Sequence, residues 1–316
     1  MWKRRLNLLY GIRTPLNAVW AITLGGLLMI SSPVLAYEEK KDFQGGTLMG
    51  VVSLKTSLPT PRRHNLVVYP DPYFCGRVSD GHGWRLSPFL QPGTDHTLPG
   101  IVVYIKDIKK GKPTDAQTPI IKTQDCRFSP YISVVGRNKV ITFQNWDPVI
   151  HRVEVFQPSI EGARLLIHED LQRNPNSQKS DFLTMGKQGN HVPGSKIIYT
   201  VQTSGPLIFR CSYHDYMEGW SLILEHPYFF ITRKDGTFSI TDIPSGTYTL
   251  IAWHPSGTAE KVIQVQSAQT LNITLDFRPT PVKTDLQTES KANPFGIDLI
   301  GDSRIVPTVE RQQWNE

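Results

Sequence analysis

Seven residues at positions 211–217, Cys-Ser-Tyr-His-Asp-Tyr-Met, place a thiol, an imidazole and a thioether three residues apart. Copper that cycles between +1 and +2 favours a thiolate and two imidazoles in a trigonal plane, with a weak thioether on the axis. A loop this short can supply Cys211, His214 and Met217 from one side. His151, at the start of a predicted strand, is the candidate for the second imidazole. The spacing therefore predicts one copper ion bound by these four residues.

Each of these residues also has a simpler interpretation. Cys211 by itself could be a buried structural cysteine, which is the commonest fate of a lone thiol. Met217 could be a core residue beside Trp220, because an axial thioether bonds only weakly. His226 and His254 adjoin prolines at predicted strand ends, and we expect them to be structural or exposed rather than ligands. The other histidines have no partner at metal-binding spacing and receive no role: His64, His82, His96, His168 and His191.

The first 36 residues have the pattern of an export signal. A basic start precedes an apolar stretch at residues 18–30, and Val34-Leu35-Ala36 offers small residues before a cleavage site at Tyr37. An uncleaved membrane anchor over residues 16–36 is the alternative, although polar residues and a proline interrupt that stretch. Either interpretation predicts a periplasmic or exported protein, in contact with a membrane only if the segment is uncleaved.

Export would place the three cysteines in an oxidising compartment, where two normally pair. We expect a disulfide between Cys75 and Cys126, which closes a loop and stabilises the fold by up to roughly 4 kcal/mol on the chain-entropy model. Cys211 remains as a free thiol. A free thiol in such a compartment oxidises unless it is buried or bound to a metal, so this argument supports the copper site independently.

Composition favours an all-β protein that does not bind nucleic acid. The 316 residues include 24 glycines and 24 prolines, spread among β-branched and aromatic residues, which is typical of short strands joined by tight turns. The length suits two domains plus tails. The net charge of +6 includes the basic start, and elsewhere basic residues alternate with acidic ones, so no nucleic-acid surface is expected.

Apolar alternation places several strands around the candidate ligands. Residues 131–135 and 140–145 are predicted to form a tight hairpin, and residues 151–156 form the next strand. A short helix is expected near residues 160–173. Other strands are predicted at residues 48–54, 66–69, 101–105, 196–201, 206–211, 220–224, 228–232, 238–240, 248–253, 261–265 and 271–277.

The ligand loop and its neighbours resemble the cupredoxins. The C-x-x-H-x-x-M loop has the length of the amicyanin type and follows an apolar strand, and an F-x-N-x-D segment at residues 143–147 leads to the first histidine. The resemblance covers about residues 118–226 and implies a Greek-key β-sandwich holding one type 1 (blue) copper ion. It assigns the ligand roles: equatorial imidazoles from His151 and His214, the thiolate from Cys211 and the axial thioether from Met217.

Two positions depart from the cupredoxin pattern. Small blue-copper proteins usually have an asparagine after the first ligand histidine, where it ties the two ligand segments together, and this chain has Arg152. A proline often follows the second histidine, where this chain has Asp215. Residues next to ligands hold them in place and tune the metal, so the redox potential does not follow from the resemblance.

Further segments resemble a carboxypeptidase-regulatory-like (transthyretin-like) β-sandwich. Residues 232–238 match its T-x-x-D-G-x-F turn and residues 243–248 its P-x-G-x-Y turn. Because residues 226–277 are too short for a complete sandwich, we expect two N-terminal strands to complete it, with the cupredoxin inserted. The predicted domains are a signal peptide at 1–36, the second sandwich at 45–117 plus 227–278, the cupredoxin domain at 118–226 and a disordered tail at 279–316.

The chain as a whole resembles bacterial exported proteins described as plastocyanin-like or methylamine-utilisation-like. We therefore expect a single-electron carrier rather than an enzyme, with an unknown cytochrome or periplasmic oxidoreductase as redox partner and with His214 near the surface as the exit for electrons. The chain lacks the H-x-H pairs of multicopper oxidases and the second loop cysteine of dinuclear copper centres. Two alternatives stay open: a protein that handles copper without redox cycling, and a structural sandwich whose metal site has decayed.

Overall fold

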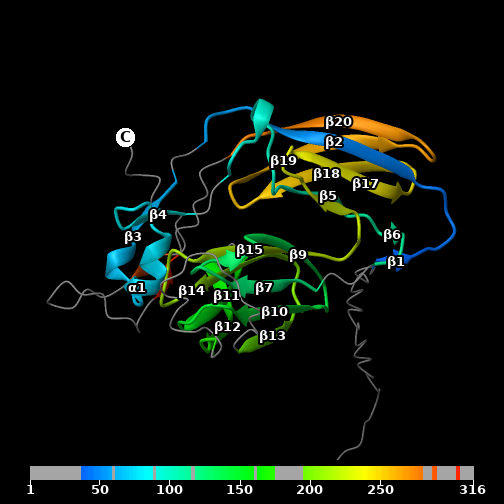
Figure 1. Ribbon diagram of the computed structural model, residues 1–316. Helices are drawn as coiled ribbons and strands as arrows, with labels where there is room; N and C mark the ends of the chain where they lie inside the picture. Colours follow the sequence, from blue (N-terminus) through cyan, green and yellow to red (C-terminus); the bar gives the residue numbers. More distant parts are fainter. Residues whose placement is uncertain are drawn as a thin grey trace, which may run out of the picture. The chain divides into compact units, whose positions relative to one another are not determined.

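Strands carry almost all the regular structure of the computed structural model, which describes residues 37–58, 61–87, 90–114, 118–159, 162–174, 195–279, 287–289 and 304–306 (Figure 1). This confirms the predicted all-β class. The predicted signal peptide at residues 1–36 lies outside the described residues. Among the described residues, no helix is long and apolar enough to cross a membrane.

The first sandwich is built from two sheets. A four-stranded sheet has the order β13-β10-β7-β8, and a five-stranded sheet has the order β12-β11-β14-β15-β9. The chain crosses repeatedly between the two sheets, as expected of a Greek key. The strands of the first sheet are β7 (Ile120–Thr123), β8 (Phe128–Ser129), β10 (Val140–Asn145) and β13 (Lys196–Thr200). Those of the second are β9 (Ile132–Gly136), β11 (His151–Ser159), β12 (Gly162–Leu171), β14 (Gly205–Cys211) and β15 (Glu218–Leu224).

One hydrophobic core joins the two sheets of this sandwich. In β10 every second residue is buried, and the buried Phe143 lies in edge contact with Phe209 of β14, with 5.4 Å between ring centroids. Phe128 of β8 contacts Phe209 at the same centroid distance. Cys211 belongs to this cluster of buried side chains, so the candidate site lies at the edge of a dry core.

The predicted hairpin at residues 131–145 is wrong. β9 pairs with β15 and β10 pairs with β7 and β13, so the two strands belong to different sheets. The turn between them is tight, with Lys139 N–H donating to the Gly136 carbonyl at 3.1 Å and with Asn138 in the left-handed region at φ 60°. The sequence shows a tight turn, but whether the chain then pairs with itself or crosses to the other sheet depends on partners distant in sequence.

The helix expected near residues 160–173 is also wrong. Within that segment Gly162–Leu171 is strand β12, which pairs antiparallel with β11, and the register of the pair shifts between Val155 and Phe156 of β11. The burial of β12 does not alternate regularly, because it is an edge strand with few buried side chains. Backbone pairing with β11 decides its conformation, and periodicity alone does not show it.

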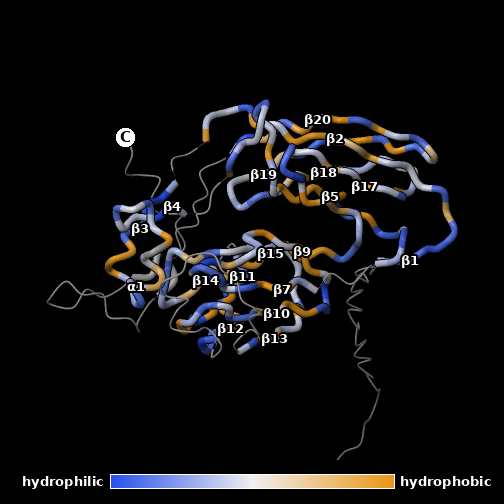
Figure 2. Tube along the Cα trace, in the orientation of Figure 1, coloured by the Kyte–Doolittle hydropathy of each residue, from blue (hydrophilic) through white to orange (hydrophobic). Residues whose placement is uncertain are grey.

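A second sandwich contains the two turns that resemble the regulatory-like module. Its sheets have the orders β16-β5-β18-β19 and β17-β2-β20. Their strands are β2 (Gly46–Leu54), β5 (Val102–Lys106), β16 (Phe229–Ile231), β17 (Thr237–Ile243), β18 (Gly246–His254), β19 (Gly257–Val265) and β20 (Thr270–Phe277). Apolar residues recur along the strands of both sandwiches in Figure 2.

The N-terminal strands share sheets with the C-terminal strands. β2 pairs in parallel with β20 and antiparallel with β17, and β5 pairs antiparallel with β16 and β18. Leu48 and Val52 of β2 are fully buried in one cluster with Phe238 and Phe277. The domain boundaries proposed from the sequence stay predictions.

Residues 63–86, which we call the cap segment, form a small unit of their own. β3 (Arg63–Asn65) pairs antiparallel with β4 (Trp84–Leu86), and three helical turns lie between them: η1 (Leu66–Val68), α1 (Pro72–Cys75) and η2 (Gly76–Val78). The strand predicted at residues 66–69 is therefore wrong. Asn65 caps η1, because its side-chain oxygen accepts from the Val67 N–H at 3.1 Å.

The remaining elements are short. β1 (Glu38–Glu39) pairs in parallel with β6 (Lys110–Gly111), and η3 (Thr94–His96) follows the cap segment. The predicted disordered tail at residues 279–316 lies largely outside the described residues. Its described parts form an antiparallel pair of strands, β21 (Gln287–Glu289) and β22 (Arg304–Val306).

Candidate metal centre

Strand pairing brings His151 and Cys211 together. His151 begins β11 and Cys211 ends β14, and these strands are antiparallel with Val153 opposite Cys211. The loop after Cys211 then turns back on itself. His214 N–H donates to the Cys211 carbonyl at 3.1 Å, and Met217 N–H donates to the His214 carbonyl at 2.8 Å. The loop is therefore held tightly around its own backbone.

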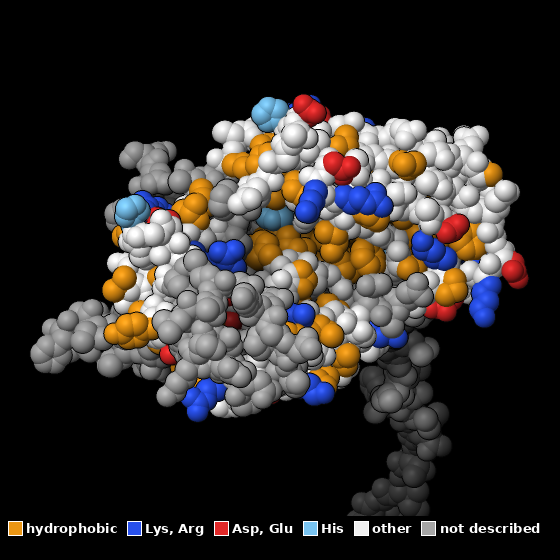
Figure 3. Space-filling view, viewed as in Figure 1, with side chains coloured by type: hydrophobic (Ala, Val, Ile, Leu, Met, Phe, Trp, Pro, Cys, Tyr) orange, Lys and Arg blue, Asp and Glu red, His pale blue; other side chains and the backbone are white. Residues whose placement is uncertain are grey.

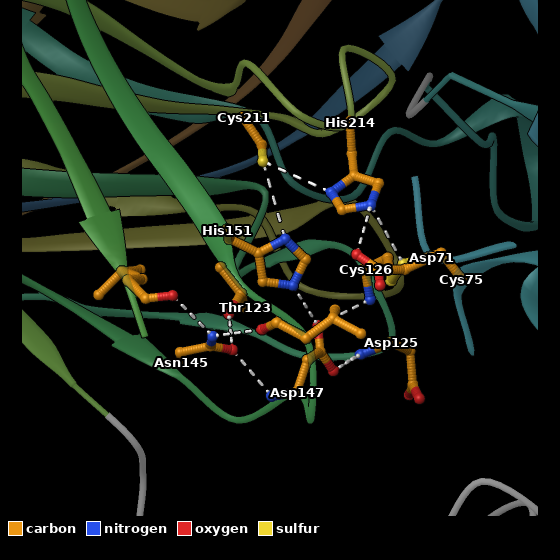
Figure 4. Close-up of polar contacts among 12 residues, drawn as sticks. Asp71, Cys75, Thr123, Asp125, Cys126, Asn145, Asp147, His151, Cys211 and His214 are labelled. Carbon is orange, nitrogen blue, oxygen red and sulfur yellow. Dashed lines mark hydrogen bonds and ion pairs between the residues drawn. A yellow bond between two sulfur atoms is a disulfide. The ribbon is translucent and has the colours of Figure 1, made fainter. Parts of the chain in front are cut away.

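Cys211 lies between two imidazoles. Its sulfur is 3.7 Å from Nδ1 of His151 and 3.6 Å from Nδ1 of His214 (Figure 4). All three residues are fully buried. They form one of two groups of potential ligands, among the described residues, whose donor atoms lie within 4.8 Å of one another. The structure thus brings together three of the four residues predicted to bind copper.

The outer nitrogen of each imidazole meets an atom that can only accept a hydrogen bond. Nε2 of His151 lies 2.8 Å from the Asp147 carboxylate, and Nε2 of His214 lies 3.1 Å from the Pro70 carbonyl. In both rings Nε2 therefore carries a proton and donates it. With Nε2 as the donor, Nδ1 is the nitrogen that can offer a lone pair to a metal. Both of these nitrogens face the same sulfur.

The distances fit a metal ion in a trigonal plane. An ion at the centre of such a plane has bonds of about 2.3 Å to sulfur and about 2.0 Å to nitrogen. The sulfur and each nitrogen are then about 3.7 Å apart. The observed separations are 3.7 and 3.6 Å. A thiolate with two imidazoles is the donor set of blue-copper sites, so the residues present fit copper.

The three side chains also perturb one another's protonation. Burial raises the pKa of Cys211, but hydrogen bonds and charge from both histidines outweigh it and lower the pKa to about 6. Burial lowers the pKa of His151, but hydrogen bonds to Asp147 and Cys211 outweigh it and raise the pKa to about 9. Without metal, the pair at neutral pH is a thiolate beside an imidazolium. A metal that binds there displaces a proton.

Asp147 holds His151 in place, a role that the sequence analysis did not assign. Its carboxylate is almost fully buried and accepts from the backbone N–H groups of Asp125 at 2.7 Å and Cys126 at 3.0 Å, as well as from His151. The signal was present in the sequence, because Asp147 ends the F-x-N-x-D segment four residues before His151. Its partners are backbone groups, which sequence patterns do not reveal.

Asn145 orders the chain that leads to His151. Its amide nitrogen donates to three carbonyls, those of Val149 at 2.7 Å, Leu171 at 3.0 Å and Gln172 at 3.1 Å. Its oxygen accepts from the Thr123 hydroxyl and from the Asp147 N–H. All the hydrogen-bonding positions of this buried amide group are satisfied by rigid neighbours, so the segment between Asn145 and His151 has little freedom.

The structure contradicts the expectation that His214 lies near the surface. Its side chain has no exposed area, because the cap segment covers its outer edge. Nε2 lies 3.1 Å from the Pro70 carbonyl. It also lies 3.6 Å from the sulfur of Cys75 and 3.9 Å from the Asp71 carboxylate (Figure 4). Nothing in the local sequence of the loop indicates this cover, which comes from residues some 140 positions earlier.

The cap segment is fastened to the ligand-bearing sandwich. The predicted disulfide between Cys75 and Cys126 is present and joins α1 to the loop before β8. The buried Arg85 donates to the Cys126 carbonyl at 2.9 Å and lies over the Tyr216 ring, 5.2 Å from its centroid. Tyr216 in turn packs edge-on against Tyr69, with 5.0 Å between centroids. A covalent bond and packing contacts therefore hold the cap over the loop.

Met217 is buried in the same hydrophobic cluster as Cys211. Its 1% exposure is what either a ligand or an ordinary core residue would show. Its role as axial ligand stays a prediction.

The second group of potential ligands is Cys126, Asp147 and His151. Cys126 is bonded to Cys75 and offers no thiolate, and the other two side chains are hydrogen-bonded to each other. This group therefore supports the first site and does not form a separate one.

His226 and His254 are buried, with 7% and 5% exposure. Nδ1 of His226 accepts from the Tyr228 N–H at 3.2 Å, and Nδ1 of His254 accepts from the Ser256 N–H at 3.0 Å. Neither belongs to a ligand group among the described residues.

Figure 3 shows that basic and acidic side chains are interspersed on the described surface of the face drawn.

No protein-family description and no curated protein matches this sequence. Similar solved structures include a purple cupredoxin from Nitrosopumilus maritimus, with 17% identity over 35% of this chain and 100% of that one, at a TM-score of 0.24. Amicyanin from Paracoccus versutus matches with 12% identity over 39% of this chain and 97% of its own, at a TM-score of 0.25. A copper-containing nitrite reductase from Thermus scotoductus has 15% identity over 36% of this chain and 24% of its own, at a TM-score of 0.25.

Proposed function

We propose that this chain is an exported type 1 copper protein that carries single electrons and is not an enzyme. The observation that supports this most directly is the pair of Nδ1 atoms, each fixed by a hydrogen bond at Nε2, that face one buried sulfur. Copper bound there would supply a centre that gains and loses one electron. Met217 completes the proposed ligand set.

The protein's own residues would keep the centre rigid and dry. Asp147 and the Pro70 carbonyl fix the two rings, and the antiparallel pairing of β11 with β14 fixes the sulfur. Because these groups are placed before a metal binds, little rearrangement is needed between oxidation states. This favours electron transfer.

The disulfide supports the proposed location. Disulfides persist in oxidising compartments, and Cys75–Cys126 is fully buried beside the candidate site. We propose a periplasmic or exported location, with a cytochrome or another periplasmic oxidoreductase as redox partner. Because no predicted ligand is more than 1% exposed, that partner would exchange electrons through covering residues and not with a ligand directly.

The burial of all the predicted ligands also favours one competing function, the handling of copper without redox cycling. A site whose ligands are all buried retains its ion well. Such a protein would bind Cu(I) tightly and show no reversible Cu(II)/Cu(I) couple.

The absorption spectrum of the Cu(II)-loaded protein, recorded beside that of a Cys211→Ser variant, tests the proposal. We expect one copper per chain, an intense visible charge-transfer band that Cys211→Ser abolishes, and a reversible voltammogram. A Met217→Leu variant should keep the band and change the potential. Tight Cu(I) binding without the band would show copper handling, and no stoichiometric binding would show a structural protein.

A further inference from the structure

Arg152 occupies the position next to the first candidate ligand, and its side chain makes a clasp across three segments. Its guanidinium donates to both carboxylate oxygens of Asp170, at 2.7 and 3.2 Å, and lies over the ring of Tyr213, 4.7 Å from the centroid. The Tyr213 hydroxyl donates to the same carboxylate at 3.4 Å. We propose that this clasp is the positioning device that sets the ligand loop against β11, an inference that rests on the proposed copper function.

The clasp lies where the ligand-bearing segments meet. Arg152 follows His151, and Tyr213 lies between Cys211 and His214 in the loop. Asp170 of β12 is directly opposite Arg152 in the antiparallel pair with β11. Arg152 and Tyr213 are therefore each next to a candidate ligand in the sequence, and Asp170 lies in the strand that pairs with β11. A shift of Tyr213 relative to Arg152 moves the sulfur relative to the first imidazole.

A backbone contact reinforces the same junction. The Ser212 N–H donates to the Arg152 carbonyl at 3.2 Å, just beyond the last strand pair at Val153 and Cys211. The hydroxyl of Ser212 is buried and has no hydrogen-bond partner among the described residues. The side chain of Arg152 contacts Tyr213 and Asp170 and not the Ser212 hydroxyl. The side-chain contact between β11 and the ligand loop is therefore made by Tyr213.

The planar shape of the guanidinium is essential to this role. Arginine can donate two parallel hydrogen bonds to a carboxylate while its face stacks on an aromatic ring, whereas the ammonium of lysine is a point charge that does neither. The Arg152 and Asp170 side chains are 29% and 33% exposed, so their charge attraction alone is partly screened by solvent. The stack and the fixed geometry distinguish this clasp from an ordinary surface ion pair.

Three variants, Arg152→Ala, Arg152→Lys and Tyr213→Ala, test the clasp against a matched control. Arg137→Ala removes another half-exposed arginine–carboxylate pair, with Glu225, that touches no ligand segment. In copper-loaded protein, we expect the three clasp variants to shift the visible band and the potential. They should also release copper to a chelator roughly 10-fold faster, whereas the control should match the parent protein.

Hydrogen exchange of the metal-free protein gives a second readout that does not need copper. The Ser212 amide should exchange roughly five-fold faster in the clasp variants and not in the control. If the parent protein does not bind copper, the proposed function fails, and the exchange result still decides whether the clasp orders the loop. Variants that lose stability but keep the band, the potential and Ser212 protection would overturn the inference, and so would an Arg152→Lys variant that behaves like the parent.

Discussion

At the scale of single residues, the candidate centre depends on which nitrogen of each histidine is free. A carboxylate at one ring and a carbonyl at the other each fix the proton on Nε2. The two acceptors differ in charge: Asp147 can bear a negative charge against His151, whereas Pro70 offers His214 a neutral oxygen. The two imidazoles are therefore electronically different ligands.

Replacing Asp147 with asparagine should weaken copper binding. The amide keeps the shape of the side chain but removes the charge that makes His151 a basic ligand, and it leaves two backbone N–H groups with a poorer acceptor. We expect copper affinity to fall by roughly 10-fold or more. Competition with a chelator of known affinity measures it.

The control is Asp276→Asn, which removes an exposed carboxylate from an ion pair with Lys55 in the second sandwich. Its copper affinity should equal that of the parent protein. Equal affinities in the Asp147 and Asp276 variants would contradict the assigned role of Asp147.

At the scale of elements, the cap segment decides how the centre meets its surroundings. It is fixed to the sandwich by Cys75–Cys126, Arg85 and aromatic packing. The disulfide links residues 51 positions apart. Because a cross-link acts mainly on the unfolded chain, its loss should affect stability as well as the cover over His214.

Removing the disulfide with Cys75→Ser and Cys126→Ser should lower the free energy of unfolding by about 4 kcal/mol on the chain-entropy model. Chemical denaturation measures this loss. In the metal-free variant, loosening of the cap should also let a histidine-directed reagent modify His214, which is covered in the parent protein. His254, buried in the second sandwich, should stay protected and serves as the internal control. An unmodified His214 would show that packing alone holds the cap.

At the scale of the whole molecule, stability should depend on two histidines distant from the centre. Burial lowers the pKa of His226 to about 4 and that of His254 to about 3. An unfolded histidine has a pKa near 6.5, so the unfolded state binds more protons below that pH. Their contribution is complete above about pH 6.5, and it is lost progressively as the pH falls from there toward the two folded values.

Unfolding by urea at pH 7 and pH 5 tests this dependence. Between pH 7 and pH 5, His226 and His254 should each lower the free energy of unfolding by at most about 2 kcal/mol. A His226→Gln, His254→Gln variant should lose less stability between the two pH values than the parent, whatever its absolute stability. The His82→Gln variant, changed at an exposed position, should show the same change in the free energy of unfolding between pH 7 and pH 5 as the parent. Equal slopes in all three proteins would show that these histidines are not protonated on unfolding.

The sequence by itself determined the fold class and predicted the candidate donor set. Alternating apolar residues and abundant turn residues predict strands, because burial on one face of a sheet imposes a period of two. The spacing of Cys211, His214 and Met217 is set within one loop, so local sequence contains it. His151 followed from the strand that it begins, and the pairing of Cys75 with Cys126 was also predicted correctly.

Tertiary structure alone decided what surrounds those donors. The crossing between β9 and β10 and the cap over His214 depend on contacts between residues far apart in the chain, and the pairing of β12 with the preceding strand β11 was not visible in the apolar periodicity. Asp147 accepts from two backbone N–H groups, Pro70 acts through its carbonyl and Arg152 through a stacked ring, and none of these contacts can be read from the sequence. Local sequence sets which ligands a loop can offer, whereas the burial and hydrogen bonding that tune them arise only when distant segments pack together.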